Sequence, residues 1–93
     1  MIKSFADKDA LLIWQGTSCR RLPADIQATA RRKLRMLNNA ANLEDLRAPP
    51  ANRLESLRGD RKGQHSIRIN DQWRICFLWK DRDAHNVAIV DYH

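Results

Sequence analysis

The sequence predicts an α+β fold, with an N-terminal strand and two or three helices packed on one face of a mainly antiparallel, twisted sheet. Two observations lead to this prediction. Apolar residues recur at three- or four-residue steps in the first half of the chain and at every second position after residue 53. The first period is that of an amphipathic helix and the second that of a half-buried strand. Because the chain has 93 residues, we expect one domain over residues 1–93.

The first half is expected to contain the strand and the helices. Residues 1–6 form the predicted strand, and Asp7 is placed to cap a helix over residues 8–16, which Gly16 would stop. Pro23 suits the first turn of a second helix, where its missing N–H costs nothing. The apolar stripe of that helix comprises Ile26, Ala30, Leu34, Leu37 and Ala41.

The opposite side of the second helix is strongly basic. It carries Arg31, Arg32, Lys33 and Arg35, which we expect on a solvated face. Residues 43–47 could add one more turn before Pro49 and Pro50, which do not fit inside a helix. The basic face is therefore a candidate for electrostatic contact with RNA.

The second half reads as an antiparallel meander. The expected strands are residues 53–57, 65–69, 73–79 and 86–92, joined by loops over 59–63, 70–72 and 81–85. In the strand over 73–79, one face carries Trp73, Ile75, Phe77 and Trp79, and the other carries Arg74, Cys76 and Leu78. We expect the helices to cover the first face and to leave the second open, with Arg74 on it.

Composition narrows the classes of function. Seventeen Lys and Arg stand against eleven Asp and Glu, for a net charge of +6, which is typical of a nucleic-acid-binding domain. Cys19 and Cys76 lie far apart without metal-ligand spacing, so we expect reduced thiols in a cytoplasm and no bound metal or cofactor. No apolar run approaches the length of a membrane helix, so no membrane role is expected.

The chain ends on Asp91, Tyr92 and His93, directly after an apolar strand. A metal-free ribonuclease needs a base for the ribose 2′-OH, an acid for the leaving 5′-oxygen and a cation at the phosphoryl group. His93 could act as base or acid, and Arg74 suits the cationic role. Each residue also has a purely structural alternative, as a chain end, a packing residue or a solvated strand position. The residues alone therefore leave the ribonuclease hypothesis open.

Several motifs together resemble the HigB branch of the RelE superfamily of toxins. They are Asn52–Arg61, Gly63–Asn70, Gln72–Ile75 and Val90–His93, with the opening Met1–Phe5. The resemblance implies a RelE-like microbial ribonuclease fold and a type II toxin–antitoxin system. It further implies a ribosome-dependent, metal-independent endoribonuclease, an mRNA interferase that cleaves translating mRNA in the A site of the 70S ribosome by 2′-OH attack. The implied partners are 16S rRNA, contacted by the basic helix, and a HigA-type helix-turn-helix antitoxin encoded next to the toxin.

The resemblance also implies site residues. The catalytic set is His93, Tyr92, Asp91 and Arg74, and the substrate-binding set is Arg58, Gln72, Glu55 and Arg68. Arg58 stands where related proteins often have lysine, and Gln72 where some have asparagine. Glu55 is a departure, because some relatives have histidine there, which removes a candidate proton shuttle.

Two alternatives follow from the same residues. A basic sheet with aromatic side chains could bind RNA or the ribosome without cutting it. The departure at Glu55 would also fit an attenuated toxin that acts mainly as the partner of its antitoxin. Blocked elongation with intact mRNA would favour the first alternative, and normal growth at high toxin level the second.

Overall fold

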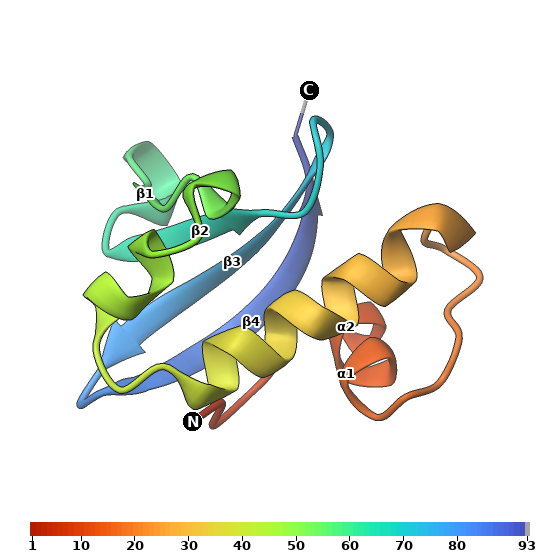
Figure 1. The fold of residues 1–93 in the computed structure, drawn as a ribbon, viewed down its shortest axis with the longest axis horizontal. Coiled ribbons are helices and arrows are strands. Elements are labelled where there is room, and N and C mark those ends of the chain that lie inside the picture. Colours follow the sequence, from red (N-terminus) through yellow and green to blue (C-terminus); the bar gives the residue numbers. More distant parts are fainter. Residues whose placement is uncertain (93) are drawn as a thin grey trace.

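The computed structural model describes residues 1–92 and confirms the α+β fold (Figure 1). Helices α1 (Lys8–Trp14) and α2 (Ala24–Asn39) precede a four-stranded antiparallel sheet in the order β1-β2-β3-β4. The strands are β1 (Glu55–Ser56), β2 (Gln64–Arg68), β3 (Trp73–Lys80) and β4 (Asp83–Asp91). Three short 3-10 helices lie between α2 and β2: η1 (Leu43–Arg47), η2 (Pro50–Asn52) and η3 (Gly59–Arg61). The extra turn expected over residues 43–47 is therefore present as η1.

The N-terminal segment is less regular than predicted. It makes two isolated parallel bridges to β4, Ile2 with Ala84 and Phe5 with Val87, instead of a continuous strand. The physical reason lies in β4, where Asn86 has a φ of 52° and leaves the extended conformation between the two bridges. Backbone hydrogen bonds still tie the segment to the outer edge of β4.

Helix α1 begins where the sequence predicts. One carboxylate oxygen of Asp7 accepts a hydrogen bond from the Ala10 N–H at 2.6 Å, as an N-cap should. The other accepts from the Ile89 N–H in β4 at 3.0 Å, so the same side chain fixes the helix against the sheet. The helix ends at Trp14, two residues before the expected stop, and Gly16 follows with a φ of 86°.

Helix α2 differs from the prediction at three positions. Pro23 is the residue before the first helical turn, and Ala41 lies beyond the helix end on an exposed position. The sequence predicts Lys33 on the solvated basic face, but only 7% of it is exposed. It is buried because its ammonium group donates a hydrogen bond to the side chain of Asn52, which is itself fully buried.

One loop prediction and one strand prediction fail at residues with positive φ. Asp81 and Arg82 both have positive φ, 53° and 66°, which gives a two-residue hairpin turn of the kind that matches strand twist. The strand β4 therefore begins at Asp83, inside the expected loop over 81–85. Similarly, β1 is reduced to two residues because Arg53 has a φ of 43° and cannot be part of a strand.

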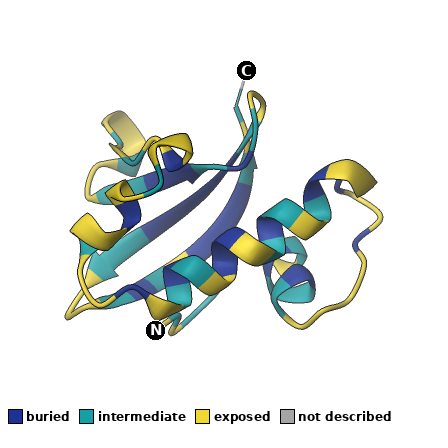
Figure 2. Ribbon diagram, in the orientation of Figure 1, coloured by how far each residue is buried: buried dark blue, intermediate teal, exposed yellow. Residues whose placement is uncertain are grey.

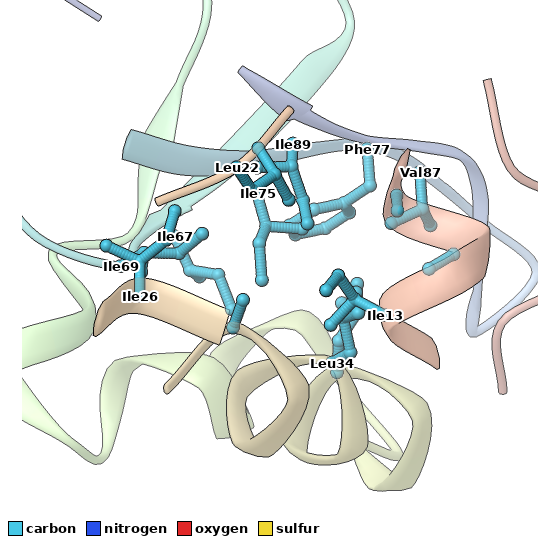
Figure 3. Packing of buried hydrophobic residues seen from close by; sticks show 14 of the residues in the cluster. Ile13, Leu22, Ile26, Leu34, Ile67, Ile69, Ile75, Phe77, Val87 and Ile89 are labelled. Atoms are coloured by element: carbon cyan, nitrogen blue, oxygen red, sulfur yellow. The ribbon is translucent and has the colours of Figure 1, made fainter. Parts of the chain in front are cut away.

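The main core lies between the helices and one face of the sheet (Figure 3). It includes Ile13, Leu34, Ile67, Ile75 and Phe77, none of which is exposed to solvent. Figure 2 shows this burial along β3 and β4 and on one side of α2. The alternation predicted for β3 is confirmed on this face, since Ile75 and Phe77 belong to the core that the helices cover.

The second face of the sheet is not open as expected. Arg74 is only 8% exposed and Cys76 is fully buried, as is Ser66 next to both in the β2–β3 register. The guanidinium of Arg74 binds Ser66, and the side chain of Tyr92 interacts with Cys76. Longer side chains therefore cover the small ones, and this face carries a polar layer. No helix within residues 1–92 is long and apolar enough to cross a membrane.

Candidate active site

A hollow of about 400 Å³ lies on the sheet face that carries Arg74. Its lining residues come from the segment before β1, from β1, β2 and β3, from the β2–β3 turn and from the end of the described chain: Arg53, Glu55, Arg68, Asn70, Asp71, Arg74 and Tyr92. Three arginines and two carboxylates thus face a single concave surface. A basic hollow that also contains an aromatic ring suits an RNA phosphate and its neighbouring base.

Arg74 is the most constrained residue of the hollow. Its Nε donates to the Ser66 hydroxyl at 2.7 Å, and its Nη2 donates to the Arg53 carbonyl at 2.6 Å. The Glu55 carboxylate lies 4.0 Å from the same Nη2. Within residues 1–92 no hydrogen bond involves Nη1. The guanidinium group of Arg74 is therefore held in place through Nε and Nη2, and its third nitrogen, Nη1, can donate hydrogen bonds to a ligand.

Tyr92 stands beside Arg74 on the same face. The Arg74 Cζ lies 6.0 Å from the centre of the Tyr92 ring, which is the outer limit of a cation–π contact. The Tyr92 N–H donates to the Gln72 carbonyl, which extends the β3–β4 pairing by one residue. Burial raises the pKa of the Tyr92 hydroxyl, and its contact with Cys76 acts in the same direction. The phenol, which is protonated at neutral pH in any case, therefore keeps its proton to a higher pH than an ordinary tyrosine.

The β2–β3 hairpin forms one rim of the hollow. The side-chain oxygen of Asn70 accepts hydrogen bonds from the Gln72 N–H at 2.9 Å and the Trp73 N–H at 2.8 Å, which fixes the turn. Arg68 forms an ion pair with Asp71 across this turn. Arg68 therefore lines the hollow with its charge already partnered.

The structure brings together four of the eight predicted site residues: Arg74, Tyr92, Glu55 and Arg68. Asp91 does not line the hollow, because alternation along β4 turns adjacent residues to opposite faces. Its carboxylate instead accepts a hydrogen bond from Gln72 at 3.2 Å, and both residues are exposed. Arg58 is exposed before η3 and is also absent from the lining. His93 lies outside the described residues.

Arg53, Asn70 and Asp71 line the hollow although the predicted site set includes none of them, and the one that adds a positive charge is Arg53. Arg53 belongs to the motif Asn52–Arg61. The periodicity, however, places it in the strand predicted over residues 53–57 and indicates no function for its side chain. Its left-handed backbone has no sequence signal, because glycine or asparagine is the usual residue at positive φ. As for metals, no cluster of three His, Cys, Asp or Glu side chains that could hold an ion occurs within residues 1–92.

Comparisons with known proteins point to one family. The family described as RelE-like toxin of type II toxin-antitoxin system HigB matches residues 3–93. Toxin HigB-1 of Vibrio cholerae is 46% identical over 70 residues, which cover 75% of this chain and 74% of that protein. Endoribonuclease HigB of Proteus vulgaris is 31% identical over 93 residues, the full length of both chains.

Solved structures support the fold. A crystal structure of a YafQ mutant from E. coli superimposes with a TM-score of 0.65 at 13% identity, covering 98% of this chain and 93% of that one. YoeB in a heterotetrameric YoeB–YefM toxin–antitoxin complex from Staphylococcus aureus gives a TM-score of 0.62 at 18% identity, covering 100% and 98%. On the family match over nearly its whole length, the chain belongs to the HigB family of RelE-like toxins of type II toxin–antitoxin systems.

Proposed function

We propose that this toxin is a ribosome-dependent endoribonuclease that cleaves translating mRNA in the A site and so stops protein synthesis. The observation that carries the proposal is the hollow around Arg74, where three arginines and Tyr92 converge on one sheet face. A full-length relative bears the name endoribonuclease. The ribosome would hold the mRNA in position, so that a domain of 93 residues needs only a small site of its own.

The proposed reaction is an internal transfer at phosphorus. The ribose 2′-oxygen attacks the adjacent phosphorus while the bond to the 5′-oxygen breaks, leaving a 2′,3′-cyclic phosphate and a 5′-OH. Glu55 takes the proton from the 2′-OH, because its carboxylate lies in the hollow 4.0 Å from the Arg74 guanidinium. His93 returns a proton to the leaving 5′-oxygen. The chemistry needs no metal.

Arg74 and Tyr92 have separate roles in this proposal. Arg74 stabilises the charge that builds on the phosphoryl oxygens, and its bonds to Ser66 and Arg53 keep it oriented before RNA arrives. The Tyr92 ring stacks on a base next to the scissile bond, since its partly buried ring lies beside that arginine. Arg68, at the β2–β3 hairpin, adds positive charge close to the bound phosphate. Arg58, Gln72 and Asp91 lie outside the hollow, and we assign them to contacts with RNA beyond the cut.

We infer two further partners, 16S rRNA from the positive charge of α2 and an antitoxin from the family. Exposed arginines of α2, Arg32 and Arg35, would contact 16S rRNA. A HigA-type helix-turn-helix antitoxin would bind the toxin and block this activity in the cytoplasm. The antitoxin assignment rests on the family match and on solved relatives that occur in toxin–antitoxin complexes.

A reconstituted translation reaction tests the proposal. Ribosomes translating a defined mRNA are mixed with the toxin, and the new 5′ ends of the mRNA are mapped. Wild type should cut at one codon position, while Arg74→Ala, Glu55→Gln and His93→Gln should each lower the cleavage rate by roughly a hundredfold or more. Lys80→Met, which removes an exposed charge far along β3, is the matched control.

Two outcomes would contradict the proposal. Stalled ribosomes with intact mRNA would instead identify a binding module that does not cut. Unchanged cleavage by Arg74→Ala would show that the hollow is not the site. The chemistry is checked separately through the product ends, because metal-dependent hydrolysis leaves a 5′-phosphate and 2′-OH attack leaves a 5′-OH.

A further inference from the structure

The three arginines of the hollow differ in how far their charges are already used. Arg68 is ion-paired with Asp71. Arg74 faces Glu55 and makes three hydrogen bonds to Ser66 and the Arg53 carbonyl. The Arg53 side chain is exposed and has no carboxylate within ion-pair distance in the part of the chain that the structure describes. An incoming phosphate therefore meets an unused guanidinium fork at Arg53.

The backbone of Arg53 is in an unfavourable conformation. Its φ of 43° and ψ of 58° lie in the left-handed region, which costs energy for any residue with a Cβ. Such residues persist where the surrounding structure holds them, and they concentrate at functional sites. Here the Arg53 N–H donates to the Pro50 carbonyl at 3.2 Å, and the Arg53 carbonyl accepts from Arg74 at 2.6 Å. The strained residue thus orients both its own side chain and the Arg74 fork.

A buried polar pair precedes this strained residue directly. Asn52 is 0% exposed, and its side-chain oxygen accepts a hydrogen bond from the Lys33 ammonium group of α2. Its amide nitrogen donates to the Leu46 carbonyl of η1 at 3.0 Å. Asn52 is thereby fixed to two separate elements, one residue before the left-handed turn. Lysine is almost never fully buried without a partner, and here the partner is the residue directly before Arg53.

We propose that Arg53 binds an RNA phosphate in the hollow beside Arg74, and that Lys33 and Asn52 are positioning residues that hold Arg53 there. This inference rests on the proposed ribonuclease function. Lys33 and Asn52 do not line the hollow and would not touch the RNA. They act by fixing η2, so that the chain leaves it in the left-handed conformation and presents both the Arg53 side chain and its carbonyl.

Single-turnover cleavage of ribosome-bound mRNA tests the role of each residue. Arg53→Ala should lower the rate by roughly ten- to hundredfold, the range expected when a group that positions the substrate is removed. Lys33→Met should lower the rate by the same order although position 33 is outside the hollow. Lys33→Arg, which retains a charged donor, should restore most of the rate. Lys80→Met, an exposed change of the same charge, should leave it unchanged.

The double variant separates positioning from general destabilisation. If Lys33 acts through residue 53, Lys33→Met combined with Arg53→Ala should cleave more slowly than Arg53→Ala alone, because alanine retains the carbonyl that orients Arg74, but by less than the product of the two single effects. Rate reductions that multiply would overturn the positioning role. Thermal unfolding verifies that each variant is folded, and Lys33→Gln takes the place of Lys33→Met if the latter does not fold.

A readout without RNA keeps this inference distinct from the proposed function. In the free toxin, the ¹⁵N side-chain signal of Arg74 reports its hydrogen bonds to Ser66 and Arg53. Lys33→Met should shift that signal and speed its hydrogen exchange, while Lys80→Met should not. A wild type that cuts no mRNA would refute the proposed function. A wild type that cuts, together with wild-type rates for Lys33→Met and Arg53→Ala, would refute the inference alone.

Discussion

At the scale of single residues, the polar layer on the sheet face that carries the hollow changes the pKa values of Tyr92 and Cys76. Cys76 is fully buried next to Ser66, and its side chain interacts with that of Tyr92. Burial is the largest cause that raises the pKa of both side chains. Both groups are therefore held in their neutral forms, which suits a ring that has to stack on a base and a thiol that takes no part in the chemistry.

The raised pKa of Cys76 predicts a stability that depends on pH. Above the ordinary thiol pKa of 9.0, the unfolded chain loses its thiol proton while the folded chain keeps it. The folded state then binds more protons, so the free energy of unfolding falls as pH rises. Cys76→Ser and Cys76→Ala should both flatten this decline, measured by urea unfolding at pH values below and above 9.0. An unchanged slope in both variants would contradict the prediction.

At the scale of elements, Asp7 connects α1 to the sheet. Its two carboxylate oxygens serve the Ala10 N–H of α1 and the Ile89 N–H of β4. Removal of an N-cap costs about 1 kcal/mol, and an amide left without a partner costs about 1–3 kcal/mol. Asp7→Ala should therefore lower the free energy of unfolding by roughly 2–4 kcal/mol.

Urea unfolding with matched variants tests this value for Asp7. Asp7→Asn retains one acceptor oxygen and should lose about half as much stability. Lys8→Ala, an exposed change at the next position, should stay within about 0.5 kcal/mol of wild type. A decrease below about 0.5 kcal/mol for Asp7→Ala would show that water replaces both hydrogen bonds.

The elements that could be predicted are those with a strong local signal. The cap at Asp7, the stripe of α2 and the alternation of β3 each depend on residue type and spacing. The errors cluster at non-glycine residues with positive φ, namely Arg53, Asp81, Arg82 and Asn86. For Arg53 and Arg82 nothing in the residue type indicates this conformation, whereas Asp81 and Asn86 are of types that adopt it more often than most residues.

The candidate site was predictable to the same extent. Arg68 and Arg74 pair across β2 and β3, so they share a face that alternation could identify. The same rule separates Asp91 from Tyr92, so these two neighbours in the sequence do not share a face of the sheet. The prediction for Lys33 is wrong because a lysine on a basic stripe is usually solvated, and its buried acceptor is 19 residues away.

At the scale of the whole molecule, the arginines proposed to contact the ribosome and the proposed active site lie on different sides of a small domain. Its extents are 31 × 26 × 25 Å, with the helices on one face of the sheet and the hollow on the other. A ribosome could therefore be contacted by the arginines of α2 while mRNA enters the hollow. The net charge of +6 adds a long-range attraction to RNA, which salt would weaken.

This arrangement predicts that ribosome binding and cleavage can be separated by salt. Each phosphate interaction that a variant removes should reduce the slope of log affinity against log salt by about 0.7–0.9. Arg32→Gln with Arg35→Gln should therefore weaken binding and lower the slope by about 1.5, because two arginines no longer neutralise phosphates. Cleavage at saturating toxin should stay near the wild-type rate, since neither residue lines the hollow.

The control is Lys3→Gln with Lys80→Gln, which changes the net charge equally at exposed positions outside α2 and should leave the slope nearly unchanged. Equal slopes for the two double variants, measured by sedimentation with ribosomes, would mean that net charge and not α2 determines binding.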